Sequence, residues 1–156
     1  MQTLELLAPA KNLDCGIAAV DHGADAIYIG ASHHGARAAA GNSIEDIRSL
    51  CNYAHRFGVS VHATVNTIVY DQEVDEALEL VDQLADAGVD ALLIQDMGLL
   101  SLITDDSPLA MKLRQKRIAL HASTQCDTRS AEKVKWLSGL GLDRVVLARE
   151  LSLEQM

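Results

Sequence analysis

The chain has 156 residues, of which 49% are hydrophobic and 22% charged, and its formal net charge is −9. This length and apolar content are enough for one globular domain with a sizeable core, and no apolar run approaches the ~20 residues of a membrane span. The negative charge argues against a nucleic-acid-binding surface spread over the whole chain. Three scattered cysteines (Cys15, Cys51 and Cys126) and the lack of a secretory signal predict a cytoplasmic protein without a disulfide framework.

A repeated unit organises the sequence. The segments HGADAIYIG, AGVDALLIQ and LGLDRVVLA each place a glycine and an aspartate before a short apolar run, and FGVSVHATV is a weaker copy. Their glycines, Gly23, Gly58, Gly88 and Gly141, are expected to take the left-handed conformation that closes a helix. The aspartate then forms a turn, and a buried strand begins.

Helical patterns precede these strands. Apolar residues recur at helical spacing over residues 12–22, 43–58, 71–88 and 128–141. Ser43 and Asp71 are the expected N-caps of the second and third helices, and Ser152 is the expected cap of a further helix at the end of the chain. The strands are expected at LELLAP, AIYIG, SVHATVNT, ALLIQD, RIALHAST and RVVLARE.

Alternating strands and helices predict an α/β fold with right-handed βαβ units and a parallel sheet. A doubly wound open sheet and a TIM-type barrel both fit, but the first turn, LAPAKNLD, lacks the Gly-rich signature of the open sheet. The regular repeat favours the barrel, which needs eight strands. We therefore expect residues 1–156 to form a partial TIM-type (β/α) barrel of about six βα units, truncated at the C-terminus of this chain and belonging to a longer protein. Its unpaired edges predict self-association of the fragment.

Polar side chains gather where the predicted strands end, which is the end that carries the active site in TIM barrels. In the stretch LHASTQCD, side chains alternate along a strand, so His121, Ser123 and Gln125 are expected on one face. The third strand ends in Asn66 and the fourth in Asp96. The predicted polar ring consists of Arg37, Asn66, Asp96, His121, Ser123, Gln125, Arg149 and Glu150.

Several residues have a structural interpretation beside the functional one. His62 shares a strand face with Asn66, but it can equally be a core histidine. Cys126 is expected to be a small packed residue, since no nucleophile–base pair can be named. The basic segment 112–135 is interpreted as a solvated helix surface, with a strip for an acidic ligand as the alternative. No His-x-His or Cys-x-x-Cys pair is present, so no metal site is expected in this chain.

The segments ELLAPA, GARAAAGNS, AHRFG, TVNT, GVDALLIQDMG, LHASTQCD and VVLARELSLEQ resemble, in order and spacing, the N-terminal domain of the peptidase U32 family. HASTQ followed by ARELSL is the most specific part of this resemblance. The combination of LHASTQCD and QDMG is similar to the bacterial U32 proteins needed for 5-hydroxycytidine in 23S ribosomal RNA. The resemblance thus implies an RNA-base hydroxylation enzyme, with a collagenase-like U32 peptidase and a non-enzymatic adaptor as alternatives.

The resemblance also implies roles and partners. Asp96, His121 and Glu150 become candidate catalytic residues, and the candidate substrate-binding residues are Arg37, Asn66, Ser123, Gln125 and Arg149. Prephenate is implied as a small anionic co-substrate, with the two arginines as its partners, and ribosomal RNA or its precursor as the macromolecular partner. A 4Fe-4S cluster is implied too, held by cysteines beyond residue 156, because none of the three cysteines here falls in a matching motif. No membrane association is expected.

Overall fold

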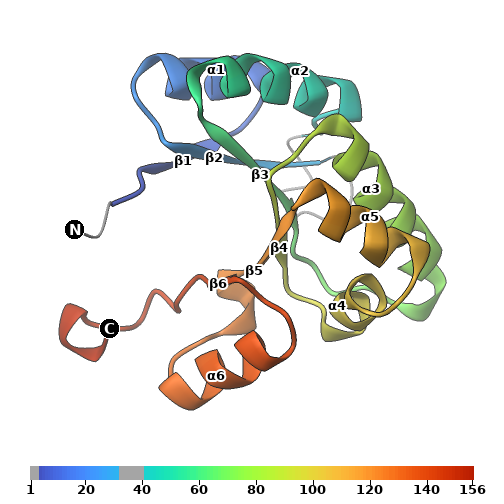
Figure 1. The fold of residues 1–156 in the computed structure, drawn as a ribbon. Helices are drawn as coiled ribbons and strands as arrows, with labels where there is room; N and C mark the ends of the chain where they lie inside the picture. Colours follow the sequence, from blue (N-terminus) through green and yellow to red (C-terminus); the bar gives the residue numbers. More distant parts are fainter. Residues whose placement is uncertain (1–3, 32–40) are drawn as a thin grey trace.

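The computed structural model describes residues 4–31 and 41–156. One parallel sheet contains six strands in the order of the sequence. The strands are β1 (Leu7–Ala10), β2 (Ala26–Gly30), β3 (Ser60–Val65), β4 (Ala91–Ile94), β5 (Ala119–Ala122) and β6 (Arg144–Val145). The sheet is strongly curved, its helices lie on the outer face, and the described N-terminal and C-terminal segments both lie at its open side (Figure 1). The predicted partial barrel is confirmed.

The helices are α1 (Leu13–Asp21), α2 (Ile44–Ala54), α3 (Val74–Ala87), α4 (Met97–Thr104), α5 (Pro108–Lys116) and α6 (Ala131–Gly139). Ser43 caps α2 as predicted, since its side chain accepts a hydrogen bond from the Asp46 N–H. The predicted cap at Asp71 is wrong. Asp71 instead begins a 3₁₀ turn, η3 (Asp71–Glu73), in which the Glu73 carboxylate accepts the Tyr70 N–H.

The repeated aspartates fix the register of the barrel. Asp25, Asp90 and Asp143 each accept a hydrogen bond from a backbone N–H at the start of the preceding strand in the sheet, at 2.7–2.9 Å. The donors are Leu6, Val61 and Leu120. The four repeat glycines all have φ between 72° and 94°, as predicted. The motif therefore ends one helix and ties the strand that follows to its neighbour.

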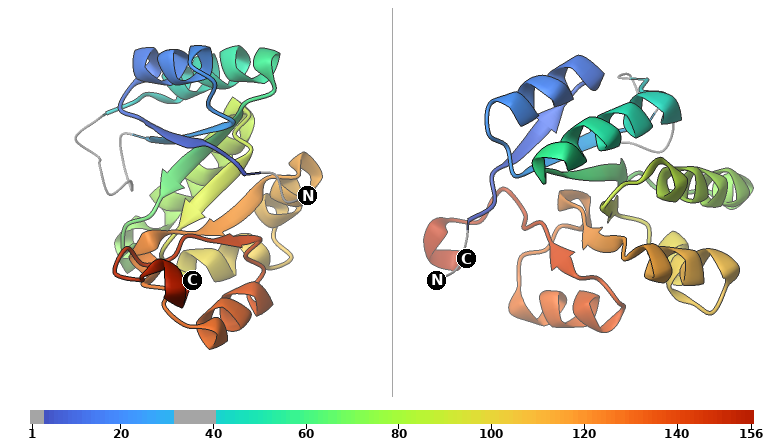
Figure 2. Two further views of the ribbon diagram at one scale, coloured as in Figure 1. Left: turned by 90° about the vertical axis from the view of Figure 1, so that its left-hand side faces the viewer. Right: turned by 45° about the horizontal axis from the view of Figure 1, so that its top comes forward.

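The two faces of the sheet carry different side chains. On the outer face, Ile29, Val61 and Leu92 are fully buried in the core shared with the helices, and Figure 2 shows the helices covering this face only. Because side chains alternate along a strand, the residues next to these, and next to Leu120 of β5, lie on the inner face. His62 and His121 are two of these inner residues, and they are buried as well. The apolar core and the candidate site thus share strands but occupy opposite faces.

The open side of the sheet exposes two edge strands, since β1 and β6 each have one neighbour. Leu4 and Leu153 lie near these edges in sequence and are 95% and 89% exposed. The Arg144 guanidinium of β6 donates to the Glu5 carboxylate just before β1, at 2.5 and 3.2 Å. An ion pair thus connects the two ends of the described sheet. Within the described ranges, no helix is long and apolar enough to cross a membrane.

Candidate functional site

Side chains from β3 and β5 meet at the C-terminal edge of the sheet. Asn66 follows β3, and its Nδ2 donates a hydrogen bond to Ser123 Oγ, 3.0 Å away, just after β5. Ser123 is 1% exposed. The strand between them, β4, pairs with both β3 and β5. Two residues predicted for the polar ring are thus in direct contact across the mouth of the barrel.

Two histidines lie one layer below this contact. His62 on β3 and His121 on β5 are 4% and 5% exposed, and their rings stand perpendicular with centroids 5.0 Å apart. Burial lowers the pKa of both imidazoles, and the neighbouring His62 and Arg144 lower the pKa of His121 further, to about 4. Both rings are therefore neutral near pH 7. His62 lies on the strand face that leads to Asn66, as the alternation along β3 indicated, and it contacts the candidate residue His121.

The segment that follows β5 leaves the strand earlier than predicted. Ser123 Oγ accepts the Gln125 N–H at 3.3 Å, and residues Thr124–Cys126 form a 3₁₀ turn, η4. Gln125 is consequently an exposed turn residue, so its predicted place on the strand face beside His121 is wrong. A side-chain hydroxyl that bonds the backbone two residues on competes with strand geometry.

Cys126 and Lys133 hold this turn in place. The Cys126 thiol donates to the Ile94 carbonyl at the end of β4, with an Sγ–O distance of 3.4 Å. Lys133 Nζ donates to the backbone carbonyls of Cys126 and Asp127. Burial raises the pKa of the Cys126 thiol, so it is a poor nucleophile. These contacts support the packed, structural interpretation of Cys126.

Asp96 has a clear structural task. Its Oδ1 accepts the Leu99 N–H at 2.9 Å and thereby caps α4, and its Oδ2 accepts the Val69 N–H at 3.4 Å. A carboxylate that takes two backbone N–H groups positions the loops after β3 and β4. Asp96 thus lies at the predicted edge, and the role that the structure shows for it is that of a cap.

The remaining predicted residues differ in their contacts. Arg149 follows β6, is exposed and has no side-chain partner among residues 4–31 and 41–156. Glu150 is 65% exposed at its side chain and faces Arg129 at 3.9 Å, while Arg129 also pairs with Asp127 at 2.5 Å. Arg37 lies outside the described residues.

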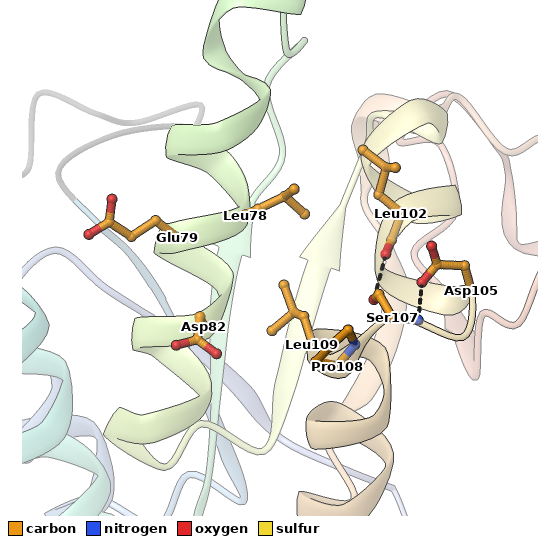
Figure 3. A pocket seen from close by; sticks show the side chains of 8 residues that line it. All are labelled: Leu78, Glu79, Asp82, Leu102, Asp105, Ser107, Pro108 and Leu109. Carbon is orange, nitrogen blue, oxygen red and sulfur yellow. Dashed lines mark hydrogen bonds between the residues drawn. The ribbon is translucent and has the colours of Figure 1, made fainter.

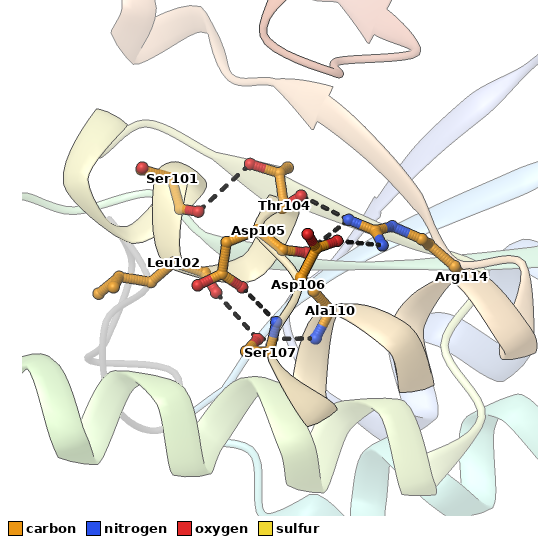
Figure 4. A network of polar contacts seen from close by, with 8 residues as sticks. All are labelled: Ser101, Leu102, Thr104, Asp105, Asp106, Ser107, Ala110 and Arg114. Carbon is orange, nitrogen blue, oxygen red and sulfur yellow. Dashed lines mark hydrogen bonds and ion pairs between the residues drawn. The ribbon is translucent and has the colours of Figure 1, made fainter.

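The basic residues of α5 are largely paired within the chain. Lys112 Nζ lies 2.7 Å from Asp82 and 2.8 Å from Asp86, both on α3. Arg114 donates to the backbone carbonyls of Thr104 and Asp105 (Figure 4). Arg114 also has an acidic partner, Asp106, at 3.6 Å. Because these cations already have acidic partners, the interpretation of α5 as a helix surface is favoured over an anion-binding strip.

Two surface cavities lie away from the strand ends. One, of about 510 Å³, separates α3 from the turn between α4 and α5, with Leu78, Asp82 and Leu109 among its lining residues (Figure 3). The other, of about 810 Å³, lies between α5 and the end of α6. Neither contains a residue of the predicted ring. The candidate site therefore rests on the convergence of polar side chains from several strands.

Within residues 4–31 and 41–156, the side chains do not form a metal or cluster site. No group of three or more His, Cys, Asp or Glu side chains in the described part of the chain is arranged to hold a metal ion. An iron–sulfur cluster needs several thiolates together, whereas Cys15 is exposed on α1 and Cys51 is buried on α2, where burial raises its pKa to about 12. The donor set of these residues does not fit a cluster.

The fold and its polar edge define a partial (β/α) barrel of the kind that places ligands at the C-terminal ends of its strands. A family model described as peptidase family U32 matches residues 11–156. The chain therefore belongs to the U32 family, and the predicted resemblance is confirmed.

Curated relatives carry both hydroxylation and protease names. The chain is 48% identical to the 23S rRNA 5-hydroxycytidine C2501 synthase of Escherichia coli K12, over 98% of this chain and 22% of that protein. It is 34% identical to tRNA hydroxylation protein P1 of Bacillus subtilis 168, over 95% and 33%. It is 29% identical to a collagenase of Porphyromonas gingivalis W83, over 97% and 34%. The chain thus spans about a fifth to a third of these relatives.

Solved structures agree on the fold. The structure of the U32 peptidase Mk0906 has a TM-score of 0.68 at 16% identity, covering 94% of this chain and 60% of that one. The HpcH/HpaI aldolase from Desulfitobacterium hafniense DCB-2 has a TM-score of 0.57, also at 16% identity, over 92% and 62%. At this identity, the likeness supports the barrel architecture alone.

Proposed function

We propose that this chain forms the catalytic barrel segment of an enzyme that hydroxylates a pyrimidine base in ribosomal RNA. The observation that carries the proposal is the 48% identity, over nearly the whole chain, to a protein named for 5-hydroxycytidine synthesis in 23S rRNA. The polar edge of the barrel supplies a site at which such chemistry can take place. Ribosomal RNA or its precursor, in the cytoplasm, is the proposed partner.

The residues at the mouth suit a base taken out of the RNA stack. Asn66 and Gln125 offer amide groups that can hydrogen-bond the edge of a flipped pyrimidine, and the buried Ser123 hydroxyl holds the Asn66 amide in place. His121 is neutral near pH 7 and is therefore able to accept a proton there. We assign it the acid–base role, and Asp96 the role of fixing the loops around the site.

Arg149 suits a small anionic co-substrate. Its guanidinium is exposed and unpaired among the described residues, and guanidinium groups bind carboxylates with two parallel hydrogen bonds. Prephenate is the co-substrate that the family resemblance implies, and Arg37 is its second proposed partner. Glu150 lies next to Arg149 in the chain and is proposed to orient this end of the site. The described residues do not fit an iron–sulfur cluster, so none of these proposed roles depends on one.

The charge distribution favours approach of RNA from the mouth. Lys11, just after β1, is exposed there like Arg149, whereas α3 on the outer surface carries the acidic residues Asp75, Glu79 and Asp82. Negative charge repels the phosphate backbone, and cations attract it. The mouth is thus the part of the described surface that best accommodates the substrate.

A U32 peptidase is the second candidate, favoured by the collagenase name of one relative. Peptide hydrolysis by a protein nucleophile needs an activated side chain, and the Cys126 thiol instead donates to a backbone carbonyl and has a raised pKa. Incubation of the full-length protein with gelatin, with and without chelator and serine-protease inhibitors, separates the two activities.

The proposal is tested by replacing His121 and Arg149 with alanine in the full-length protein. We expect loss of the hydroxylated base from ribosomal RNA, measured by nucleoside mass spectrometry, with a melting temperature close to that of the wild type. Lys135→Ala on the exposed surface of α6 is the matched control and should leave the modification intact. Normal modification in both mouth variants would contradict the proposal and would favour a non-enzymatic adaptor.

A further inference from the structure

The inner face of the barrel contains a buried histidine nitrogen whose hydrogen-bonding capacity is unused. His62 Nδ1 is fully buried and has no hydrogen-bond partner among the described residues, and neither His62 nor His121 has a ring hydrogen bond to another described group. Buried polar groups are almost always hydrogen-bonded. An unpaired buried imidazole nitrogen is costly for stability, and such a cost is typical of functional sites rather than of a core.

The two rings approach each other across β4. In the sheet, His62 is in register with Ala91 of β4, and His121 is in register with Leu93 of the same strand. The rings stand perpendicular to each other, with centroids 5.0 Å apart. The contact fixes the plane of each ring relative to the other. His121 lies two residues before Ser123 on the strand face that leads to the mouth, whereas His62 lies four residues before Asn66 and is deeper.

We propose that His62 is a positioning residue for His121: the two imidazoles form one acid–base pair beneath the polar mouth, in which His62 orients the ring that faces the substrate. The acid–base role of the pair rests on the proposed function, whereas the pairing of the two rings rests only on the geometry. His62 also keeps its partner available as a base, because a proton on one ring opposes a proton on the other.

The charged groups around the pair act on both rings. Glu5, Arg144, Asp90 and Asp143 are the ionisable groups that influence them from the start of β1, from β6 and from the turns before β4 and β6. Glu5 and Arg144 pair with each other, and their opposite effects on the imidazoles partly cancel. Burial is the largest cause at both rings, and His62 is the next largest at His121, so removal of His62 should be felt by His121.

The pairing is tested by NMR titration of the histidine rings in the 156-residue chain. In His62→Gln, we expect the pKa of His121 to rise from about 4 toward its ordinary value, by at least about half a pH unit, and its tautomer ratio to change. The reciprocal His121→Gln should raise the pKa of His62. His22→Gln, at the end of α1 and away from the barrel interior, is the control and should leave both titrations unchanged.

The wild-type chain provides a test that does not depend on the folding of a variant. Paired rings should titrate with two inflections, each visible at both histidines, because protonation of one changes the environment of the other. Independent single-site curves in the wild type, or a His121 titration unchanged in His62→Gln, would overturn the proposal. In the full-length protein, His62→Gln should shift the acid limb of the pH–rate profile. Coupled titrations without that shift would retain the pairing and count against the acid–base role.

Discussion

Replacement of Asp90 by alanine is expected to destabilise the fold by a predictable amount. The Asp90 carboxylate accepts the N–H of the buried Val61 at 2.7 Å, and a buried donor left without an acceptor costs about 1–3 kcal/mol. Its contact with the His55 imidazole, 2.9 Å from Nε2 to Oδ2, joins side chains that are 40% and 43% exposed and is an ion pair only when the imidazole is protonated, so it contributes at most about 1 kcal/mol. The expected loss is thus about 1–4 kcal/mol, or about 2–16 °C in melting temperature for a chain of this size.

Urea unfolding followed by circular dichroism measures this loss. Asp90→Asn keeps an oxygen that can accept the Val61 N–H and should cost less than half as much, and His55→Gln removes only the imidazole contact. If Asp90→Ala unfolds within about 0.5 kcal/mol of the wild type, which is the range of ordinary surface substitutions, the repeated aspartate does not tie the strands together as inferred.

Three further predictions concern packing, pH and assembly. Gly16→Ala should destabilise the chain by about 1–3 kcal/mol, because an added Cβ would lie 2.6 Å from the fully buried Leu50; an unchanged melting temperature would show that α1 and α2 can separate freely. The pKa of His62 and of His121 is lowered in the folded state. Below about pH 6.5 the unfolded chain therefore binds more protons than the folded chain. The free energy of unfolding should be at its full value above that pH and should decline toward pH 4. The decline in urea midpoint should be smaller in His121→Gln than in the wild type, and an equal decline would refute the assignment. We also propose that the 156-residue chain self-associates through its open edge strands, which light scattering at tens of micromolar should detect as a dimer or larger species rather than a monomer.

The repeat made the fold predictable from the sequence. Glycine and aspartate recur at fixed positions before each apolar run, and their local roles, a left-handed helix end and a turn, do not depend on distant contacts. The aspartates do more than the sequence indicated, because their bonds to the neighbouring strand depend on a register that only the folded sheet defines.

The candidate site was predictable in position but not in detail. Alternation along β3 and β5 placed His62, Asn66, His121 and Ser123 on one face, which the structure confirms. The predicted fifth strand was too long at its C-terminal end. The Ser123 hydroxyl accepts the Gln125 N–H, and the chain turns away from the strand at this point. The alternation of side chains along a strand does not reveal such competition for backbone hydrogen bonds.

The central inference, hydroxylation of an RNA base by the full-length protein, is tested most directly by mass spectrometry of nucleosides from purified 23S ribosomal RNA. Wild-type cells, a strain lacking the gene, and that strain carrying the gene on a plasmid are compared. We expect the hydroxylated pyrimidine to disappear in the deletion strain and to return with the plasmid. An unchanged amount of the hydroxylated nucleoside in the deletion strain would contradict the proposed function.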